Sequence, residues 1–219
     1  MGILLIESSS KKIEFGYAIN SKVILNEVLN ENENADTLTF FIKEAFRKND
    51  VKFNDIEFVS LSNGPGSFTG LRVGSAIAKG ICFAIGSKLI EVSTLDIIAN
   101  KLKSQRKTVS LIFSNPRAHE FYFCEYIFES GKLKRLSDYK IELLENILEN
   151  ITYRDSLFFM NESPDVIYSQ EFKDKLVDVS EFSNILSQFE LTKDMILSNE
   201  FKDYRISKPF YMKEFVPKI

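Results

Sequence analysis

The chain has 219 residues, of which 44% are hydrophobic, so it is long enough to bury a substantial core as one domain or two small lobes. The formal net charge is -3, which excludes a protein that binds a phosphate backbone through an overall basic surface. The two cysteines, Cys82 and Cys124, lie far apart inside apolar runs, which indicates small buried side chains in a reducing compartment and no disulfide framework.

The first half of the chain alternates predicted strands with predicted helices. Its start, "MGILLIESSS", has one short apolar run with no basic residue before it, which indicates a strand and neither a signal peptide nor a membrane span. We therefore expect a cytoplasmic protein with no membrane contact. The predicted order is a strand at 3–7, a strand ending near 20, a strand in "SKVILNEVL", a helix carrying the apolar residues of 38–46, a strand in "IEFVSLSNG", a helix over 68–85, and a strand and helix in "KLIEVSTLDIIANKLKS".

The second half of the chain predicts a further α/β arrangement. The expected elements are two strands in "TVSLIFSNPRAHEFYFCEYIF", a reversal at Ser130-Gly131, an amphipathic helix over 140–150, a strand in "SLFFM", an irregular polar stretch over 164–198, and an extended docked tail in "KPFYMKEFVPKI". The charged stretch "KLKSQRK" marks the predicted boundary between a lobe of residues 1–103 and a lobe of residues 104–219. Strands followed by helices in both halves favour a mixed α/β fold with sheets flanked by helices.

The stretch "SNGPGSFTGLRVGSAIAKGI" at 62–81 resembles a phosphate-binding loop that runs into a helix. A Walker A loop requires a lysine directly after its last glycine, and no lysine follows Gly70 or Gly74. The Rossmann pattern G-x-G-x-x-G has two residues between its last two glycines, whereas three residues separate Gly66 from Gly70. The structural interpretation is a sharp turn with positive φ and a helix cap from Ser67 or Thr69. The residues of this predicted structural turn are Gly64, Pro65, Gly66 and Gly70. Anion binding at the helix N-terminus, helped by Arg72, stays open as an alternative.

The helix that follows the turn is apolar almost all round, so it must be covered on more than one side. Phe40, on the preceding helix, projects nearly opposite Leu38 and adds an aromatic side chain on the side that should face water. We therefore predict that the two helices share an outer face that binds another polypeptide. The predicted interface residues are Phe40, Arg72, Val73, Ala76, Ile77, Gly80 and Ala84. A homodimer through the same face is expected when the partner is absent.

The segment "NGPGSFTGLRVGSAIAKGI" resembles the signature of the TsaB (YeaZ) family, and "ILLIESSS", "EVSTLDIIA", "NPRAHEFYFCEY" and "KPFYMK" follow in that family's order. The resemblance covers most of the chain. It implies a two-lobed actin-like (ribonuclease H-like) fold and a non-catalytic subunit of the machinery that makes threonylcarbamoyladenosine beside the tRNA anticodon. It further implies a heterodimer with the catalytic TsaD paralog, a TsaE ATPase that joins the complex, and tRNA contact only through the complex.

The resemblance implies no cofactor held by this chain alone, with ATP or ADP only at the interface of the assembled complex. The catalytic paralog binds its metal through H-x-x-x-H, which a chain with the single histidine His119 cannot supply, so we predict no metal site and no catalytic residue. We therefore expect this chain to be an inactive homolog of the peptidase-like members of this superfamily, with no peptidase activity of its own.

Two motifs depart from the pattern of actin-like relatives. Glu7 and three serines stand where such relatives have an aspartate and a phosphate-contacting hairpin, and Asn115-Pro116-Arg117 stands where they often have Asp-Ala-Arg. Arg117 and Glu120 are further polar candidates, interpreted as a surface ion pair. The alternative function is an autonomous actin-like kinase or ATPase that uses the Gly64–Gly74 loop.

Overall fold

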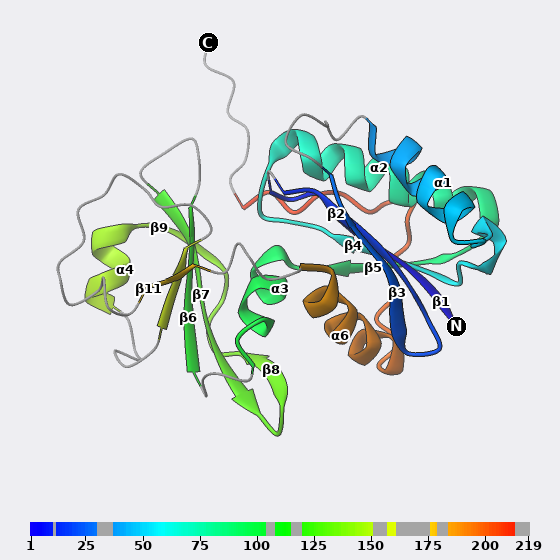
Figure 1. Cartoon of the computed structure of the whole chain (residues 1–219). Coiled ribbons are helices and arrows are strands. Elements are labelled where there is room, and N and C mark those ends of the chain that lie inside the picture. Colours follow the sequence, from blue (N-terminus) through cyan, green and yellow to red (C-terminus); the bar gives the residue numbers. More distant parts are fainter. Residues whose placement is uncertain are drawn as a thin grey trace, which may run out of the picture. The chain divides into compact units, whose positions relative to one another are not determined.

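The computed structural model describes residues 1–10, 12–29, 37–103, 108–114, 120–150, 157–160, 176–178 and 184–212 (Figure 1). The chain divides into two compact units, the first made of Met1–Ile97 and Asn184–Phe210 and the second of Ile98–Ser183 and Tyr211–Ile219. The predicted boundary between residues 103 and 104 lies close to the point where the chain first passes from one unit to the other, between Ile97 and Ile98. Assigning all of 104–219 to the second lobe was wrong, because Asn184–Phe210 returns to pack on the first sheet.

The first unit is built on a five-stranded sheet with the order β3-β2-β1-β4-β5. Its strands are β1 (Gly2–Glu7), β2 (Glu14–Ile19), β3 (Lys22–Val28), β4 (Phe58–Ser62) and β5 (Lys88–Val92). The first three strands form an antiparallel meander, whereas β4 and β5 run parallel to β1. The buried strand β1 therefore lies in the middle of the sheet, and its carboxyl end lies at the same edge as the ends of β4 and β5.

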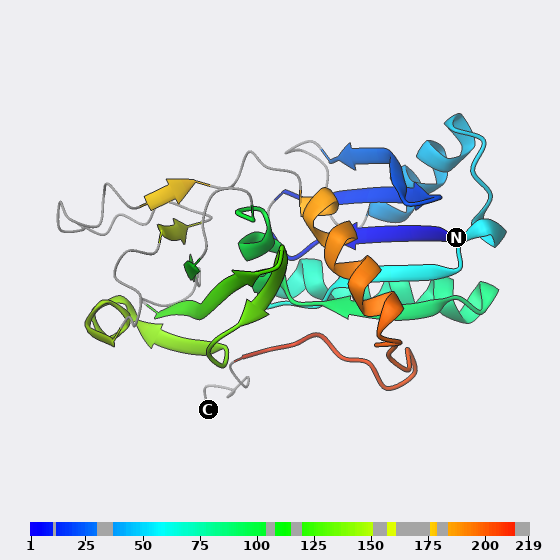
Figure 2. The same cartoon turned by 90° about the horizontal axis from the view of Figure 1, so that it is seen from below.

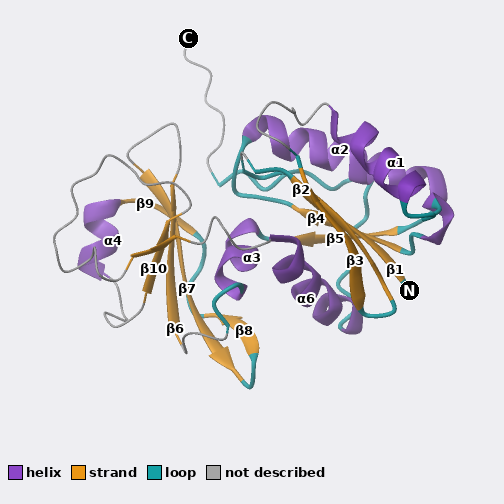
Figure 3. Ribbon diagram, in the orientation of Figure 1, coloured by secondary structure: helices purple, strands orange, loops and turns teal. Residues whose placement is uncertain are grey.

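Helices cover both faces of this sheet (Figure 2). On one face lie α1 (Leu38–Lys48) and α2 (Phe68–Ile85), with the short 3-10 helix η2 (Phe53–Asp55) between them in sequence. On the other face lies α6 (Asn184–Leu197), as the ribbon coloured by secondary structure also shows (Figure 3). The helix α3 (Thr94–Asn100) follows β5. These positions leave the outer surfaces of α1 and α2 pointing away from the sheet.

A single apolar cluster lies between the sheet and the pair α1 and α2. Its buried members include Ile42 and Phe46 from α1 and Ala78 from α2, and Tyr17 of β2 packs edge-on against Phe46 with ring centroids 5.2 Å apart. By length and mean hydropathy, α2 is the one helix in the described residues that could cross a membrane. Because its buried residues pack on the sheet in this cluster, we interpret it as a core helix.

The second unit repeats the strand order of the first. Its sheet has the order β11-β10-β6-β7-β8, with β9 paired to the other part of β7. The elements are β6 (Thr108–Ser114), β7 (Glu120–Glu129), β8 (Lys132–Arg135), β9 (Lys140–Leu143), α4 (Leu144–Asn150), β10 (Leu157–Met160) and β11 (Leu176–Asp178). As in the first unit, the first three strands, β6, β7 and β8, pair in antiparallel fashion, and two later strands, β10 and β11, run parallel to β6. This repeated topology agrees with the predicted two-lobed fold.

The described elements of the first unit up to α3 agree with the sequence-based ones apart from η2, whereas the rest of the chain differs in several places, among them the strand β8, which was not predicted. The predicted helix over 140–150 is a strand followed by a helix, because Lys140–Leu143 pairs antiparallel with Glu120–Phe123 of β7 before α4 begins. The stretch predicted to be irregular over 164–198 contains α6, which has 14 residues. The reversal at Ser130-Gly131 is confirmed, since both residues have positive φ. Of the extended tail, the described part is docked, because the Phe210 amide donates to the Asn63 carbonyl at 2.8 Å.

Candidate functional site

The glycine-rich turn connects the end of β4 to the start of α2. Gly64 has φ of 110°, a conformation that side chains other than glycine rarely adopt, and its carbonyl accepts from the Thr94 amide at 2.9 Å. The Ser67 side chain accepts from the Gly70 amide at 3.2 Å, so the predicted N-cap is confirmed at Ser67. The turn is thus a strand-to-helix connection with its first glycine required by backbone conformation.

The later glycines of this stretch are required by close packing. A Cβ atom at Gly66 would lie within 3.0 Å of the Ser9 carbonyl oxygen, and one at Gly70 would lie equally close to the Ser8 carbonyl oxygen. At Gly74 the added atom would collide with the Ser8 hydroxyl. The glycines therefore let the first turns of α2 lie directly against the segment that leaves β1. The glycine density at 64–74 has a structural cause that needs no nucleotide.

One of the amides that an anion could bind at this helix N-terminus, that of Gly70, already donates to the Ser67 side chain. The Ser67 amide donates to the Ser9 carbonyl at 2.6 Å, and the Leu71 amide donates to the Ser67 carbonyl at 2.9 Å. The Arg72 guanidinium lies over the Phe68 ring, 3.7 Å from its centroid. A phosphate that bound through the Gly70 amide or through Arg72 would compete with these contacts, which counts against the anion-binding alternative.

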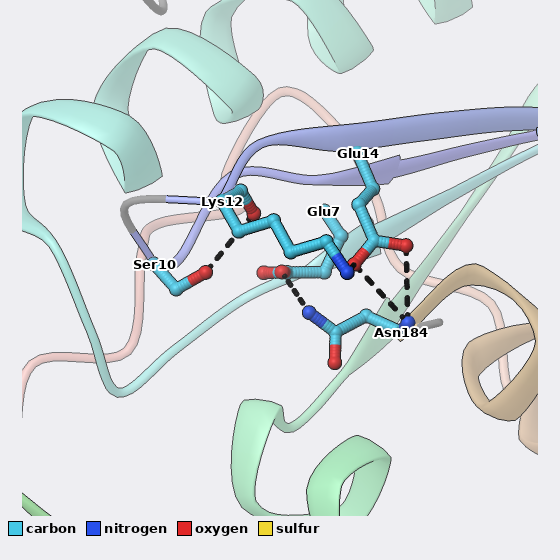
Figure 4. Close-up of polar contacts among 5 residues, drawn as sticks. All are labelled: Glu7, Ser10, Lys12, Glu14 and Asn184. Carbon is cyan, nitrogen blue, oxygen red and sulfur yellow. Dashed lines mark hydrogen bonds and ion pairs between the residues drawn. The ribbon is translucent and has the colours of Figure 1, made fainter. Parts of the chain in front are cut away.

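Glu7, at the carboxyl end of β1, is held in a buried polar cluster (Figure 4). One carboxylate oxygen accepts from the Ser9 amide at 2.8 Å and from the Ser9 hydroxyl, and the other accepts from the Asn184 side-chain amide at 2.8 Å. The Asn184 backbone amide donates to the second carboxylate of the cluster, Glu14, at 3.1 Å, and the Lys12 ammonium lies 3.5 Å from Glu14. Both oxygens of Glu7 are therefore engaged by protein groups.

Burial raises the pKa of Glu7, because taking the carboxylate out of water disfavours its charged form, and the nearby Glu14 adds to the effect. The hydrogen bonds from Ser9 act in the opposite direction but do not cancel it. Through its hydrogen bond with Asn184, the first residue of α6, the Glu7 carboxylate joins this helix to the first sheet. It does not resemble an open metal-binding side chain, and the described residues contain no cluster of three or more metal-ligating side chains.

The outer face of α1 and α2 exposes apolar side chains to solvent. Phe40 is 61% exposed and projects away from the core, as predicted from its position opposite the buried Leu38. On α2, Ala76, Gly80 and Ala84 are exposed. Gly80 has no atom within 4 Å of the position that a Cβ would take. These residues form an apolar strip across both helices, which we call the outer helix face.

Two of the predicted interface residues are only partly exposed, and one exposed residue of the same face was not predicted. Val73 and Ile77 are half-buried and pack partly against the core, so they lie at the inner border of the outer helix face. Arg72 is exposed at the start of the same strip. Phe83 is 78% exposed but was not predicted as an interface residue. Its spacing of seven from Ala76 and three from Gly80 places it on the same helical stripe, a signal that the sequence already contained.

Other sequence candidates lie outside the described residues or in the second unit. His119 and the segment Asn115-Pro116-Arg117 are outside the described residues. Glu120 is the first residue of β7. The prediction of buried cysteines is confirmed, since Cys82 and Cys124 are both buried and neither forms a disulfide.

Comparisons with known proteins agree with this fold. A solved structure described as "YeaZ from Pseudomonas aeruginosa" superposes with a TM-score of 0.78 at 17% identity, over 96% of this chain and 99% of that one. A second structure from the same organism, described as similar to peptidase YEAZ, gives a TM-score of 0.79 at 16% identity, over 97% and 99% of the two chains. The predicted mixed α/β fold class, with its helix-flanked sheets, is therefore confirmed.

Sequence comparisons identify the family. The model of the family described as "TsaD: tRNA N6-adenosine threonylcarbamoyltransferase" matches residues 28–156, more than half of the chain. The protein "tRNA threonylcarbamoyladenosine biosynthesis protein TsaB" of Buchnera aphidicola subsp. Acyrthosiphon pisum is 30% identical over 105 residues, 48% of this chain and 47% of that protein. TsaB of Escherichia coli K12 is 27% identical over 127 residues, 58% of this chain and 55% of that protein.

The chain belongs to the family of TsaD and its TsaB (YeaZ) relatives. The aligned part spans about half the length of these curated relatives.

Proposed function

We propose that this chain is a non-catalytic, partner-binding subunit in the biosynthesis of threonylcarbamoyladenosine in tRNA. Its partner in this proposal is a TsaD-type paralog, bound as a heterodimer in the cytoplasm, with a TsaE-type ATPase joining the complex. The curated relatives are named for this biosynthesis, and the matching family model is that of the transferase itself. The tRNA would be contacted only through the complex.

The observation that carries the proposal is the exposure of two phenylalanines on adjacent helices. Phe40 is 61% exposed and Phe83 is 78% exposed, on the outer sides of α1 and α2. Aromatic side chains dominate binding energy when they are buried in an interface, and exposed clusters of apolar residues mark interaction surfaces. Between them, Ala76 and Gly80 leave the helix surface low enough for a second helix to approach closely.

A paralog is a suitable occupant because it would present helices equivalent to α1 and α2. The family model matches both this chain and the transferase, so the two proteins are expected to share the elements of the first unit. Helices with small residues at the contact can interdigitate with their counterparts in a pseudosymmetric arrangement. A homodimer through the same face stays a prediction for the isolated chain.

The proposal gives the chain no bond-making residue. Several polar groups at the end of β1 and at the glycine-rich turn, among them the Glu7 carboxylate and the Ser67 amide, are engaged in internal hydrogen bonds, which supports a scaffold role. Binding the paralog would stabilise its competent conformation, since a ligand shifts an equilibrium towards the state it binds more tightly. The proposal assigns no cofactor to this chain alone and places ATP or ADP at the interface of the assembled complex.

The test measures the affinity of the intact chain for the TsaD-type paralog of the same cell. Phe83→Ser should weaken binding by about 30-fold or more, because a central aromatic anchor contributes about 2 kcal/mol or more. The matched control is Leu197→Ser, which changes a side chain that is 79% exposed, close to the 78% of Phe83, and stands in α6, the helix that covers the other face of the sheet. The control should bind as the wild type does. Equal affinity for Phe83→Ser and wild type would contradict the proposal.

A modification assay separates the two candidate roles. Omitting the chain from a mixture of paralog, TsaE-type ATPase, ATP, threonine-derived substrate and tRNA should abolish the modification. The alternative of an autonomous kinase or ATPase instead requires that the purified chain alone turns over magnesium-ATP. Such turnover, retained in Phe83→Ser, would favour the alternative.

A further inference from the structure

The segment that follows α6, residues 198–210, runs back along the edge of the first sheet, and we call it the strap (orange to red in Figure 2). It lies beside the edge strand β5, where the Lys202 amide donates to the Leu89 carbonyl at 2.9 Å in a single isolated bridge. At its far end, the Phe210 amide donates to the Asn63 carbonyl at 2.8 Å. Few backbone contacts therefore hold the strap on the sheet.

The middle of the strap is held by charged side chains of α2 and β5. The Lys79 ammonium on α2 donates to the Ser207 carbonyl at 3.0 Å, and the Ser207 hydroxyl donates to the Glu91 carboxylate on β5. Ser207 is buried, although its neighbour Ile206 is 76% exposed. Hydrogen bonds to charged groups are stronger than those between neutral groups. We call Lys79, Ser207 and Glu91 the latch.

The carboxylate of the latch depends on the strap. Burial raises the pKa of Glu91, whereas the hydrogen bond from Ser207 and the charges of two nearby lysines act against this rise. When the strap leaves, the half-buried carboxylate loses the hydroxyl that donates to it. The latch therefore favours the docked strap.

Lys79 also borders the outer helix face. It precedes Phe83 by four residues and follows Ala76 by three, and residues at these spacings are neighbours on the surface of a helix. While the strap is docked, the hydrogen bond to Ser207 directs the Lys79 ammonium to the strap. Without the strap, the long and flexible lysine side chain can place its charge over the apolar strip. A partner that covered the strip would then have to desolvate an ammonium, which is costly.

We propose that the strap and the outer helix face are coupled through Lys79. The docked strap holds the Lys79 ammonium beside Ser207, so that a docked strap and a partner bound on the outer helix face stabilise each other. This inference rests on the proposed function. In it Lys79 is a positioning residue, because it acts through the strap and makes no contact of its own with the partner.

The first experiment measures amide hydrogen exchange at Lys202 and Phe210 in the intact chain without a partner. Ser207→Ala removes the hydroxyl of the latch and should speed exchange at both amides by about tenfold or more. The matched control is Ser198→Ala, where the hydroxyl is exposed and donates to a carbonyl within α6. This control should exchange as the wild type does. Unchanged exchange in Ser207→Ala would show that the latch does not hold the strap and would overturn the inference.

The second experiment repeats the measurement with a saturating concentration of the TsaD-type paralog. By linkage, a partner that binds better when the strap is docked must slow the opening of the strap by the factor by which docking strengthens its binding. Binding should slow exchange at both amides by about tenfold in the wild type and by less than about twofold in Lys79→Met, which has no charge to place over the strip. The matched control Lys43→Met, at an exposed position on α1, should follow the wild type.

The possible results separate this inference from the proposed function. A paralog that binds through Phe83 but leaves the exchange of the strap unchanged would support the proposed function and overturn the coupling. Slowing that is as large in Lys79→Met as in the wild type would also overturn it, because Lys79 would not be the link. If Phe83→Ser binds the paralog as tightly as the wild type, the proposed function fails at this face and the coupling fails with it.

Discussion

The first sheet is covered by apolar packing on one face, whereas the packing on the other face combines apolar side chains with buried hydrogen-bonded polar ones. On the α1 and α2 side, the buried cluster is apolar and the helices keep apolar residues on their outer surface as well. On the α6 side, Gln188 and Thr192 are fully buried and both contact Ser60 of β4. A helix with more apolar surface than its own sheet can cover is free to bind another protein, whereas a helix fixed by matched polar groups is committed to its own fold.

The polar contact of α6 forms a directed chain of hydrogen bonds. The Thr192 hydroxyl donates to the Gln188 carbonyl at 2.7 Å, and it lies 2.7 Å from the Ser60 hydroxyl. Because a hydroxyl has a single proton, Thr192 must accept from Ser60. The Gln188 side-chain amide in turn donates to Ser60 at 3.0 Å and to the Ile6 carbonyl. The register of α6 on the sheet is therefore fixed by partners, and one lost partner leaves another unsatisfied.

The largest expected effect tests the inner side of α2. Gly70→Ala should destabilise the protein by about 3 kcal/mol or more, because the new Cβ would overlap the Ser8 carbonyl oxygen and force the helix away from β1. The matched control is Gly80→Ala in the same helix, where nothing lies within 4 Å of the added atom. It should stabilise by up to about 1 kcal/mol through helix propensity. Urea unfolding of both variants checks this, and a similar change for the two would contradict the close packing.

The next effect tests the polar side of the sheet. Thr192→Val should cost about 1–2 kcal/mol, because the buried Ser60 hydroxyl loses the acceptor for its proton. The double variant Ser60→Ala/Thr192→Val should cost less than the sum of the two single variants, since it removes both members of the pair. Denaturant unfolding of the full cycle measures the coupling. Strict additivity would mean that the contact does not fix α6.

The same contrast explains what the sequence could and could not predict. The helix over 68–85 was predicted with its observed bounds because its apolar residues, its Ser67 cap and the glycine before it all indicate the same element. The position of Phe40 followed from helical geometry alone. The helix α6 was missed because its buried face mixes the apolar residues Ile185 and Phe189 with the polar residues Asn184, Ser187, Gln188 and Thr192, which weakens the apolar stripe that would mark it.

The candidate site was predictable in its chemistry and less so in its extent. The glycines were interpreted as structural, but their close approach to Ser8 and Ser9 joins segments about 60 residues apart, which no local pattern reveals. Phe83 was not predicted because the small residues of the helix defined the expected face, although helical spacing places it on the same stripe. At residues 140–143, pairing with β7 overrode a helical pattern, as tertiary contacts often override local propensity.

A smaller effect concerns Glu7, where α6 meets the end of β1. Because burial raises its pKa, the folded chain binds a proton more readily than the unfolded chain, so stability falls as pH rises above the ordinary carboxyl pKa of 4.5. Glu7→Gln removes the free-energy cost of burying a charged carboxylate. If the Asn184 side-chain amide rotates by 180°, its oxygen, which has no partner within the described residues, accepts a hydrogen bond from the new glutamine NH2 group. We expect the unfolding midpoint to rise by about 3 °C at pH 7, with a smaller rise near pH 4.5.

Thermal scans across pH check this prediction, with Glu57→Gln as a control of opposite sign. The N-terminal ammonium, 3.1 Å away, lowers the pKa of Glu57, so that carboxylate stabilises the fold above its ordinary pKa and the stabilisation is lost as pH falls. Its replacement should lower the midpoint slightly at pH 7. A midpoint for Glu7→Gln that falls at every pH would mean that the charged form of Glu7 is needed to hold Asn184.

The smallest expected effect on stability lies on the outer helix face and sharpens the contrast between folding and binding. Glu44 is the one acidic residue on α1 and α2, and its pair with Arg47 is exposed. Because exposed pairs contribute little, Glu44→Gln should shift the unfolding midpoint by no more than about 1 °C. The same change should alter the affinity for the paralog by no more than about threefold, because an exposed charge at the border of an interface affects the rate of encounter more than the affinity. Binding that weakens by about tenfold or more would show that Glu44 itself contacts the partner, so that the interface extends from the apolar centre onto this ion pair.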